Sequence, residues 1–368
     1  MKILWFTWKD KKHPQAGGAE LVNEELAKRL VVDGHEVIFI VAGFKGGAVE
    51  EMINGYKIIR LGNRWTVYWQ AYRYYKRQLV GYADLVIDEM NTIPFFCKFY
   101  VKERNILFTY QLCRKIWFYQ ISFPLSLLGY ILEPFYLHFL RDRMVITESE
   151  STKIDLQRFG FKKEKIFVFP ISLSQEPISE ELFSEEKKED APTILYFGSL
   201  RAMKRPDHVW QAFKLAKKEI PNLRLWVAGA GICNYARQFL KKLERSKYHD
   251  DIRYFGRINE REKLSLMRRA HLVAVTSVKE GWGIVITEAN SQGTPAVVYD
   301  VDGLRDACKN GKTGSVIKAS PHYLSNAIMQ LLGNKTLYES YRLCAWKDSF
   351  FYNKETSYKH FINIIHKF

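Results

Sequence analysis

The feature that most constrains this chain is an order of short apolar runs, glycine-containing loops and helical stretches that occurs twice. In the first block, runs such as KILWFTW, HEVIFIVAG and ADLVID are typical of buried strands, and residues 19–30 place apolar side chains on one helical face. The second block repeats this order with TILYFG, LRLWVAGAG, IRYFG, HLVAVTS and TPAVVY. Strands that alternate with helices predict parallel sheets covered on both faces. We therefore predict an α/β fold with two doubly wound domains.

The same pattern gives the expected domain boundaries. At 368 residues the chain is longer than one hydrophobic core usually spans. We expect a first domain over 1–172, an acidic and polar linker over 173–192, a second domain over 193–345, and a terminal helix over 346–368 that packs back toward the first domain. Ligands of such sheets bind at the carboxyl ends of the strands, and two such edges facing each other would form a cleft.

Composition narrows the class of protein. A hydrophobic content of 47% and a charged content of 26% are typical of globular proteins, and the net charge of +16 favours anionic partners such as phosphorylated metabolites, nucleic acid or an anionic membrane. The five cysteines have no C-x-x-C spacing, which indicates reduced thiols. The apolar run at the N-terminus is too short for a signal peptide, so we expect a cytoplasmic protein. No ligand spacing suggests a metal site.

Residues 275–300 carry the strongest chemical pattern. Glu280 and Glu288 stand on either side of a glycine turn, and a helix is expected to start near Ile284. The free N–H groups of a helix start favour a phosphate, whereas carboxylates favour sugar hydroxyls. The segment therefore suits a ligand built as sugar, diphosphate and ribose. The alternative is that two glutamates at this distance occur by chance, and that Glu288 only stabilises its own helix dipole.

The ordered pattern S-x-x-E-G-W-G-I-x-x-x-E-A-x-x-x-G-T-P resembles that of glycosyltransferase family 4, which comprises retaining enzymes with the GT-B fold. Further segments are similar to the family in the expected order: HPQAGGAE at 13–20, then VITESESTKIDLQRFGF, KIFVFP, FGSLRAMKRPDHVWQAF and LRLWVAGAG. The resemblance covers most of the chain and is weakest over 50–140. It implies two Rossmann-like domains that bind a nucleotide sugar.

The resemblance also implies roles for single residues. Glu280 would contact the sugar of the donor substrate, Lys204 would bind the diphosphate and stabilise the leaving group, and Glu288 would bind the ribose hydroxyls. Tyr110 occupies a position where the family often has histidine, and it completes the implied catalytic set although tyrosine is a poor base at neutral pH. The other implied contacts to the donor substrate are Gly17, Gly18, Gly198, Ser199, Arg201, Gly229, Gly281, Trp282, Gly283 and Ile284.

The chain departs from the family in a second place. Ser199 stands where the family usually has arginine, and Arg201 is the candidate to replace the lost guanidinium. His13 lies in a loop and is interpreted as a positioning or surface residue rather than a catalytic one.

The function implied is metal-independent, retaining transfer of a hexosyl group from a nucleotide-diphosphate sugar to a glycan or lipid-linked acceptor, without a cofactor. The alternatives are a protein that binds nucleotide sugars without catalysis, or one with a soluble acceptor. Nucleic-acid binding is disfavoured because no RNP, helix-turn-helix or zinc-finger pattern is present.

Two segments suggest contact with the inner face of a membrane. Residues 52–83 carry basic residues interleaved with tryptophan and tyrosine but no Asp or Glu, and residues 116–132 carry no charge at all. Aromatic and basic side chains beside an apolar run are typical of proteins that lie on an anionic bilayer. The alternative is that these aromatic residues form the core of an ordinary helical insert. The sequence leaves both interpretations open.

Overall fold

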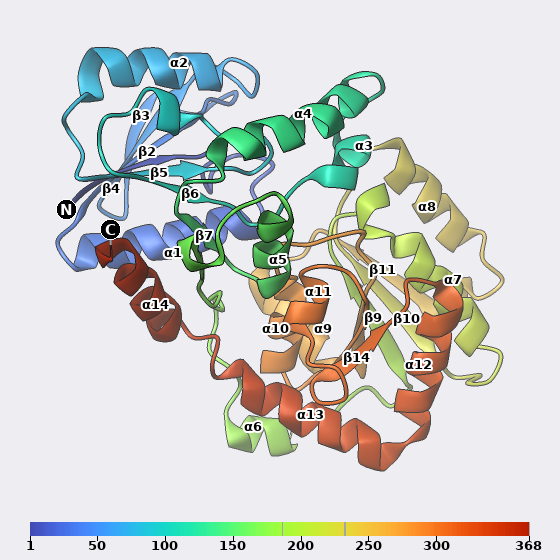
Figure 1. Ribbon diagram of the computed structural model, residues 1–368. Helices are drawn as coiled ribbons and strands as arrows, with labels where there is room; N and C mark the ends of the chain where they lie inside the picture. Colours follow the sequence, from blue (N-terminus) through green and yellow to red (C-terminus); the bar gives the residue numbers. More distant parts are fainter. Residues whose placement is uncertain (186, 232, 368) are drawn as a thin grey trace. The chain divides into compact units, whose positions relative to one another are not determined.

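The computed structural model describes residues 1–185, 187–231 and 233–367, and the chain divides into two compact units. Unit 1 comprises Met1–Ser174 together with Lys354–Phe368, and unit 2 comprises Gln175–Asn353. Each unit contains a sheet that is parallel or nearly so, with helices packed against it (Figure 1). The predicted fold class, two doubly wound α/β units, is confirmed.

The sheet of unit 1 has the strand order β3-β4-β2-β1-β5-β6-β7-β8, and only β3 and β4 are antiparallel. The chain starts at β1, adds strands on one side and then continues on the other side from β5, so the strand order reverses between β1 and β5. The strands are β1 Lys2–Phe6, β2 Glu36–Ala42, β3 Glu50–Ile53, β4 Tyr56–Leu61, β5 Leu85–Glu89, β6 Asn105–Phe108, β7 Val145–Thr147 and β8 Ile166–Val168. The helices are α1 Gly18–Val32, α2 Val67–Tyr74, α3 Trp117–Gln120, α4 Leu125–Leu140, α5 Glu150–Arg158 and α14 Lys354–His366.

The sheet of unit 2 is wholly parallel, with the order β11-β10-β9-β12-β13-β14. Here the strand order reverses between β9 and β12, which are hydrogen-bonded neighbours. The strands are β9 Thr193–Phe197, β10 Arg224–Ala228, β11 Ile252–Gly256, β12 Leu272–Val275, β13 Ala296–Tyr299 and β14 Gly314–Ile317. The helices are α6 Glu180–Glu185, α7 Pro206–Ala216, α8 Asn234–Glu244, α9 Glu260–Arg269, α10 Ile284–Ser291, α11 Leu304–Ala307, α12 Pro321–Gly333 and α13 Lys335–Ser349.

Local sequence signals account for the starts of several helices. Helix α10 begins at Ile284, and α7 begins at Pro206, where a proline is favoured because the first helical N–H needs no partner. Helix α9 is capped by Asn259, whose side chain accepts from the Glu262 N–H while Glu262 accepts in return. The hairpin β3–β4 and the edge strand β14 were not predicted. Strands β3 and β14 have only four residues each, and β3 begins with two glutamates at an exposed sheet edge, where no apolar run is required. Strand β4 is longer, but Lys57 and Arg60 interrupt its apolar run.

The predicted linker over 173–192 is instead part of unit 2 from residue 175 onward. Ile178 donates its N–H to the Ser291 carbonyl and accepts from the Trp346 indole, and the Phe183 ring stacks on Trp346 at a centroid distance of 4.6 Å. Because the segment is mostly polar, its composition did not indicate that Ile178 and Phe183 pack against unit 2. The boundary expected at 345/346 falls inside α13, and the chain passes from unit 2 to unit 1 only at Lys354.

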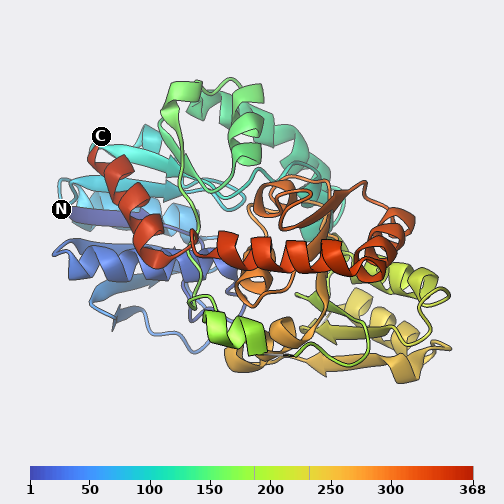
Figure 2. The same ribbon diagram turned by 90° about the horizontal axis from the view of Figure 1, so that it is seen from below.

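Helix α14 belongs to unit 1, where it lies beside α1 in Figures 1 and 2. Phe361 is fully buried and stacks on Trp5 of the central strand, with ring centroids 5.9 Å apart and an interplanar angle of 9°. Tyr358 donates a hydrogen bond to Asp33 at 2.6 Å. The end of the chain is therefore part of the core of unit 1.

Candidate functional site

The loops that follow β9 and β12 meet at the carboxyl edge of unit 2, where the strand order reverses. The Thr276 hydroxyl lies 3.0 Å from the Lys204 carbonyl and 2.8 Å from the Arg205 carbonyl, and the Val278 N–H donates to the Met203 carbonyl. These bonds join two loops that are about seventy residues apart in sequence into one platform. Open parallel sheets bind ligands at such a reversal point.

Lys204 and Glu280 form an ion pair on this platform. The Ser277 hydroxyl donates to the same carboxylate oxygen at 2.5 Å. The two charged side chains remain 24% and 15% exposed, so both can be reached from outside the unit. A ligand with a negative group and several hydroxyls could replace each partner of the pair by one of its own groups. The structure thus brings together the two residues to which the sequence assigned the central chemistry.

The glycine turn before α10 depends on its residue types. Gly283 has φ = 96°, and a Cβ there would lie 2.9 Å from the Leu304 side chain. The Trp282 indole donates to the Thr287 hydroxyl at 2.9 Å, and its ring lies 5.4 Å from Tyr352. The Trp282 side chain is therefore occupied within unit 2. Any direct contact of residues 281–284 with a ligand stays a prediction.

Glu288 is buried on α10 and has a partner that the sequence did not indicate. The Lys263 ammonium of α9 lies 2.7 Å from its carboxylate and 2.8 Å from Glu260. Burial raises the pKa of Glu288, and Lys263 opposes that shift. Lys263 shares the buried face of α9 with Leu266 and Met267. A lysine at a position where helical periodicity requires an apolar residue was the signal that could have identified it.

The remaining predicted residues of unit 2 have mainly local contacts. A Cβ on Gly229 would lie 1.9 Å from the Gly198 carbonyl oxygen, so close packing of the ends of β9 and β10 by itself requires glycine at Gly229. Arg201 is exposed, and its guanidinium donates to the Ser199 hydroxyl at 3.0 Å. Both side chains lie beside Lys204 in sequence, and the replacement of the missing arginine stays a prediction.

Tyr110 in unit 1 is buried and hydrogen-bonded to α1. Its hydroxyl donates to Asn23 at 2.6 Å and lies 3.2 Å from the Ala19 carbonyl, and the side chain is almost fully buried. Burial raises its pKa well above the ordinary value. The hydroxyl is thus engaged within unit 1, and the catalytic role that the resemblance implied for Tyr110 stays a prediction. The inner face of α1 takes up the Tyr110 hydroxyl.

Gly17 and Gly18 stand at the start of α1, where a phosphate was expected to bind. The Gly17 N–H donates to the Glu20 carboxylate at 2.6 Å, and Lys9 pairs with Glu20 at 3.2 Å. The helix start is thus already occupied by a carboxylate, which an incoming phosphate would have to displace. The expected phosphate contact of these glycines stays a prediction.

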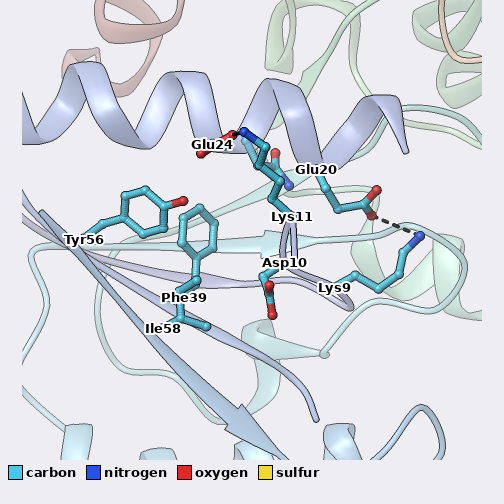
Figure 3. A pocket seen from close by; sticks show the side chains of 9 residues that line it. Lys9, Asp10, Lys11, Glu20, Glu24, Phe39, Tyr56 and Ile58 are labelled. Carbon is cyan, nitrogen blue, oxygen red and sulfur yellow. Dashed lines mark ion pairs between the residues drawn. The ribbon is translucent and has the colours of Figure 1, made fainter. Parts of the chain in front are cut away.

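Figure 3 shows a small pocket between α1 and the sheet of unit 1, close to this helix start. Glu20 and Glu24 reach into it from α1, Phe39 and Tyr56 come from the sheet, and Lys9 lies at its border. Its charged side chains are already paired, because Lys11 contacts Glu24 at 2.5 Å in addition to the Lys9–Glu20 pair. We assign no ligand to this pocket.

Sequence reasoning also missed two buried carboxyl groups in unit 1. Glu89, at the end of β5, accepts from Trp5 and Thr7 at 2.9 Å and from Asn23 and Asn91 at 2.7 Å. Burial raises its pKa to about 7, although these donors act in the opposite direction. Glu148, after β7, has a buried oxygen without a hydrogen-bond partner, and burial together with the charge of Glu89 raises its pKa well above the usual range. No local pattern marks either residue as buried.

Neither a metal-binding cluster nor a membrane-spanning helix is present in the described part of the chain. Among these residues no group of three or more His, Cys, Asp or Glu side chains is arranged to hold a metal ion. Within the same residues no helix has the length and apolar content needed to span a bilayer.

Comparison with known proteins identifies the two units. The family model "Glycosyltransferase Family 4" matches residues 16–171, and the model "Glycosyl transferases group 1" matches residues 177–345. A poly(glycerol-phosphate) alpha-glucosyltransferase of Bacillus subtilis (strain 168) is 27% identical over 195 residues, which are 52% of this chain and 28% of that protein. The chain therefore spans less than a third of that relative. An uncharacterised glycosyltransferase of Methanocaldococcus jannaschii is 26% identical over 341 residues, covering 85% of this chain and 84% of that protein.

Solved structures share the fold at low sequence identity. Sucrose-phosphate synthase from Thermosynechococcus elongatus matches with a TM-score of 0.78 and 16% identity, over 100% of this chain and 98% of that chain. Anabaena HepE in complex with UDP-glucose matches with a TM-score of 0.74 and 16% identity over the whole of both chains. These likenesses establish the GT-B arrangement of two α/β units as the fold class.

Proposed function

The chain belongs to the glycosyltransferases of the family 4 type, and from this premise we propose that it transfers a hexosyl group from a nucleotide-diphosphate sugar to a glycan or lipid-linked acceptor. We propose further that the transfer retains the configuration of the sugar. The observation that carries the proposal is the Lys204–Glu280 pair at the strand reversal of unit 2. It offers one positive and one negative group to the diphosphate and the sugar of a single ligand.

Lys204 acts on the leaving group. When the bond between the sugar and the diphosphate breaks, negative charge increases on the departing phosphate oxygen. An ammonium group held there interacts more strongly with the transition state than with the bound substrate, and this difference is what accelerates a reaction. Its partial exposure allows Lys204 to leave Glu280 for the diphosphate. In this proposal it supplies the charge without a bound metal or cofactor.

Glu280 and Glu288 hold the two ends of the donor substrate. Once Lys204 has turned to the diphosphate, the Glu280 carboxylate is free to accept from hydroxyls of the transferred sugar and to favour the positive charge that develops on its reacting carbon. Glu288 accepts from the ribose hydroxyls. The first N–H groups of α10, which lie between these residues, suit the diphosphate.

A panel of nucleotide sugars tests the donor substrate, beginning with UDP-glucose because HepE binds it. Thermal shift should show stabilisation by the correct compound, since a ligand at 100 times its dissociation constant adds about 2.7 kcal/mol. Formation of a glycosylated product or slow hydrolysis of the nucleotide sugar then separates an enzyme from a protein that only binds. Absence of stabilisation by every member of the panel would contradict the proposal.

The acceptor is proposed from the surface of unit 1, where α4 buries Leu137 and Leu140 but exposes most of its other large apolar side chains. Its buried face includes Ser126 and Glu133, whereas its outward face carries large apolar side chains. Glu133 is 1% exposed, and it accepts from the Cys113 and Arg114 N–H groups and from the Trp117 indole. These bonds fix the helix with its apolar face outward. The exposed side chains are Leu125, Leu127, Leu128, Ile131, Leu132, Phe135 and Phe139, with Phe118, Tyr119 and Phe123 ahead of the helix.

Helix α2 presents a second exposed surface of a different kind. Val67, Ala71 and Tyr75 are buried against the sheet, as the alternative of an ordinary core predicted. Trp65 and Trp69 are nevertheless 64% and 62% exposed, and basic side chains continue the same outward stripe. These basic residues are Arg73, Lys76 and Arg77. Tryptophan and basic residues on one helix face are typical of an interface with anionic lipid headgroups.

The segment 95–100 connects the two helices, which both lie along one border of unit 1 in Figure 1. The ring centroids of Tyr100 and Tyr72 of α2 lie 5.1 Å apart, and those of Phe96 and Tyr136 of α4 lie 6.1 Å apart. The Lys98 ammonium donates to the Phe139 carbonyl at 2.6 Å. We propose that this joined surface binds an anionic bilayer, with the basic stripe at the headgroups and the apolar face of α4 inserted. The acceptor substrate is then a lipid-linked glycan.

Sedimentation with neutral and anionic vesicles tests the membrane surface. Replacing Arg73, Lys76 and Arg77 by serine should weaken binding to anionic vesicles at low salt, and Phe135→Ser/Phe139→Ser should weaken the binding that persists at high salt. Replacing Lys241, Lys242 and Arg245 by serine is the control, since these exposed basic residues lie on or next to α8 in unit 2. A wild-type protein that ignores anionic vesicles at low salt would point to a soluble acceptor instead.

A further inference from the structure

Lys263 and Glu288 form an ion pair with almost no exposure to solvent. Their side chains are 7% and 6% exposed, and the Lys263 ammonium lies 2.7 Å from the Glu288 carboxylate. The pair connects α9 with α10, the helix whose start lies next to Glu280. It is thus placed directly behind the proposed site for the donor substrate.

The burial of such a pair costs desolvation free energy. Removing two charges from water is offset only by good geometry and by hydrogen bonds to the remaining atoms, and an apolar pair of similar volume is often at least as stable. Fold stability alone therefore gives a weak reason for a lysine at this position of α9. The pair does have one local consequence, because the ammonium holds one carboxylate oxygen of Glu288 in place and favours the ionised form.

We propose that Lys263 is a positioning residue for the nucleotide. It fixes the orientation and the charge of Glu288, so that this carboxylate accepts hydrogen bonds from the ribose hydroxyls over a wide range of pH. This inference rests on the proposed function, in which Glu288 binds the ribose. The groups that face the pair are Glu260 on α9 and the Phe197 ring at the end of β9, which lies 5.8 Å from the ammonium.

Unit 2 contains a second buried lysine that pairs with a carboxylate but lies away from the proposed site for the donor substrate. The side chain of Lys217 is 5% exposed, its ammonium lies 2.7 Å from Asp251, and it donates to the Leu223 carbonyl. Leu223 directly precedes β10, so Lys217 lies at the amino end of the sheet, opposite the strand reversal. It is a buried structural lysine that also pairs with a carboxylate, although Asp251 is 35% exposed whereas Glu288 is 6% exposed.

The test compares Lys263→Met with Lys217→Met in the full chain. Binding of UDP, GDP and ADP is measured by calorimetry from pH 6 to pH 8.5, and each dissociation constant is divided by the wild-type value at the same pH, which cancels the titration of the nucleotide itself. Without the ammonium, burial raises the pKa of Glu288 further, so the neutral and weaker acceptor becomes populated as the pH falls. We expect Lys263→Met to lose about tenfold in affinity at pH 6 and less at pH 8.5.

Lys217→Met is expected to lower the melting temperature but to leave the dissociation constants and their pH dependence unchanged. Lys263→Arg, which retains the charge, should restore a flat pH profile. If Lys263→Met does not fold, Lys263→Gln takes its place, because it keeps a hydrogen bond to Glu288 without the charge and should show the same pH dependence.

Two negative results have different meanings. If the wild type binds none of the three nucleotides, the proposed function is overturned and the inference with it. If the wild type binds a nucleotide and the Lys263 variants bind it with unchanged affinity at every pH, only the positioning role is overturned.

Discussion

The two units share a topology but use the carboxylate at the strand reversal in opposite ways. In unit 1 the reversal lies between β1 and β5, and Glu89 stands at the end of β5. In unit 2 it lies between β9 and β12, and Glu280 follows β12. Glu89 is 1% exposed and accepts four hydrogen bonds from neutral groups, whereas Glu280 is partly exposed and pairs with the ammonium of Lys204.

The difference shows that topology decides where a polar group is placed, while its partners decide what it can do. Four neutral donors, two at the end of β1, one on α1 and one just after β5, hold Glu89 in the fold, so that a ligand would have to disrupt the core to reach it. A single flexible lysine neutralises Glu280, and a diphosphate can attract that lysine away. The first arrangement stabilises a unit, and the second is suited to exchange partners with a substrate.

The largest expected effect concerns the flexible partner in unit 2. Lys204→Ala should lower the turnover number about 10²–10³-fold, the range found when one group that stabilises transition-state charge is removed. The affinity for the donor substrate should fall less. Steady-state kinetics and calorimetry measure the two quantities, and Lys218→Ala, on the exposed surface after α7, is the control. Equal losses in both quantities would mean that Lys204 only binds.

A pair of isosteric changes tests the contrast between the two carboxylates directly. Glu89→Gln should lower the free energy of unfolding by about 1–3 kcal/mol, because its amide would point hydrogens at two existing donors. Glu280→Gln should change stability little and reduce turnover strongly. Denaturant unfolding and kinetics are measured for both proteins. The contrast fails if Glu280→Gln is the more destabilised of the two.

Glu148 gives a smaller and pH-dependent effect in unit 1. Its folded pKa is raised by burial and by Glu89, and Tyr110 is a further titratable neighbour. Because the pKa of Glu148 is higher in the folded than in the unfolded state, its contribution to the stability of the fold is fully present below the unfolded pKa. That contribution is lost as the pH rises through the folded pKa. Glu148→Gln should therefore raise the melting temperature at pH 8 more than at pH 5. Equal shifts at both pH values would show that the buried oxygen has a partner in solution.

The smallest expected effect belongs to Arg201. Its guanidinium is exposed and bonded to Ser199, so Arg201→Ala should reduce donor affinity only several-fold, within about 1 kcal/mol for one exposed charge. Calorimetry at two salt concentrations measures the change, which should shrink as salt rises. Full activity and unchanged affinity would remove Arg201 as the substitute for the missing arginine.

The sequence predicted the units, most strands and the edge residues of unit 2 because the signals for them are local. Helical periodicity, a capping residue and a glycine turn act within about four residues, so Asn259, Pro206 and Gly283 could be interpreted without a fold. The rule that ligands bind at the carboxyl ends of parallel strands placed the loops of Lys204 and Glu280 at one edge, whereas the roles of these two residues came from the family resemblance and stay predictions.

The same rules failed where the partner of a side chain is distant. The catalytic role of Tyr110 was implied by the family resemblance and stays a prediction, but no local pattern indicated that its hydroxyl bonds to Asn23, 87 residues away. The linker over 173–192 was predicted from its acidic composition, although Trp346 anchors it to unit 2 across 168 residues. Composition does not reveal which few residues of a polar segment are buried.

What the sequence by itself determined is the order of most elements, the fold class and the glycine turn between Glu280 and Glu288. What only the tertiary structure decided is the state of each polar group. Glu89 meets Trp5 across 84 residues, and Lys263 meets Glu288 across 25. The physical reason is that burial and pairing depend on which strands and helices become neighbours, and that adjacency is set by the packing of the whole unit rather than by any local stretch.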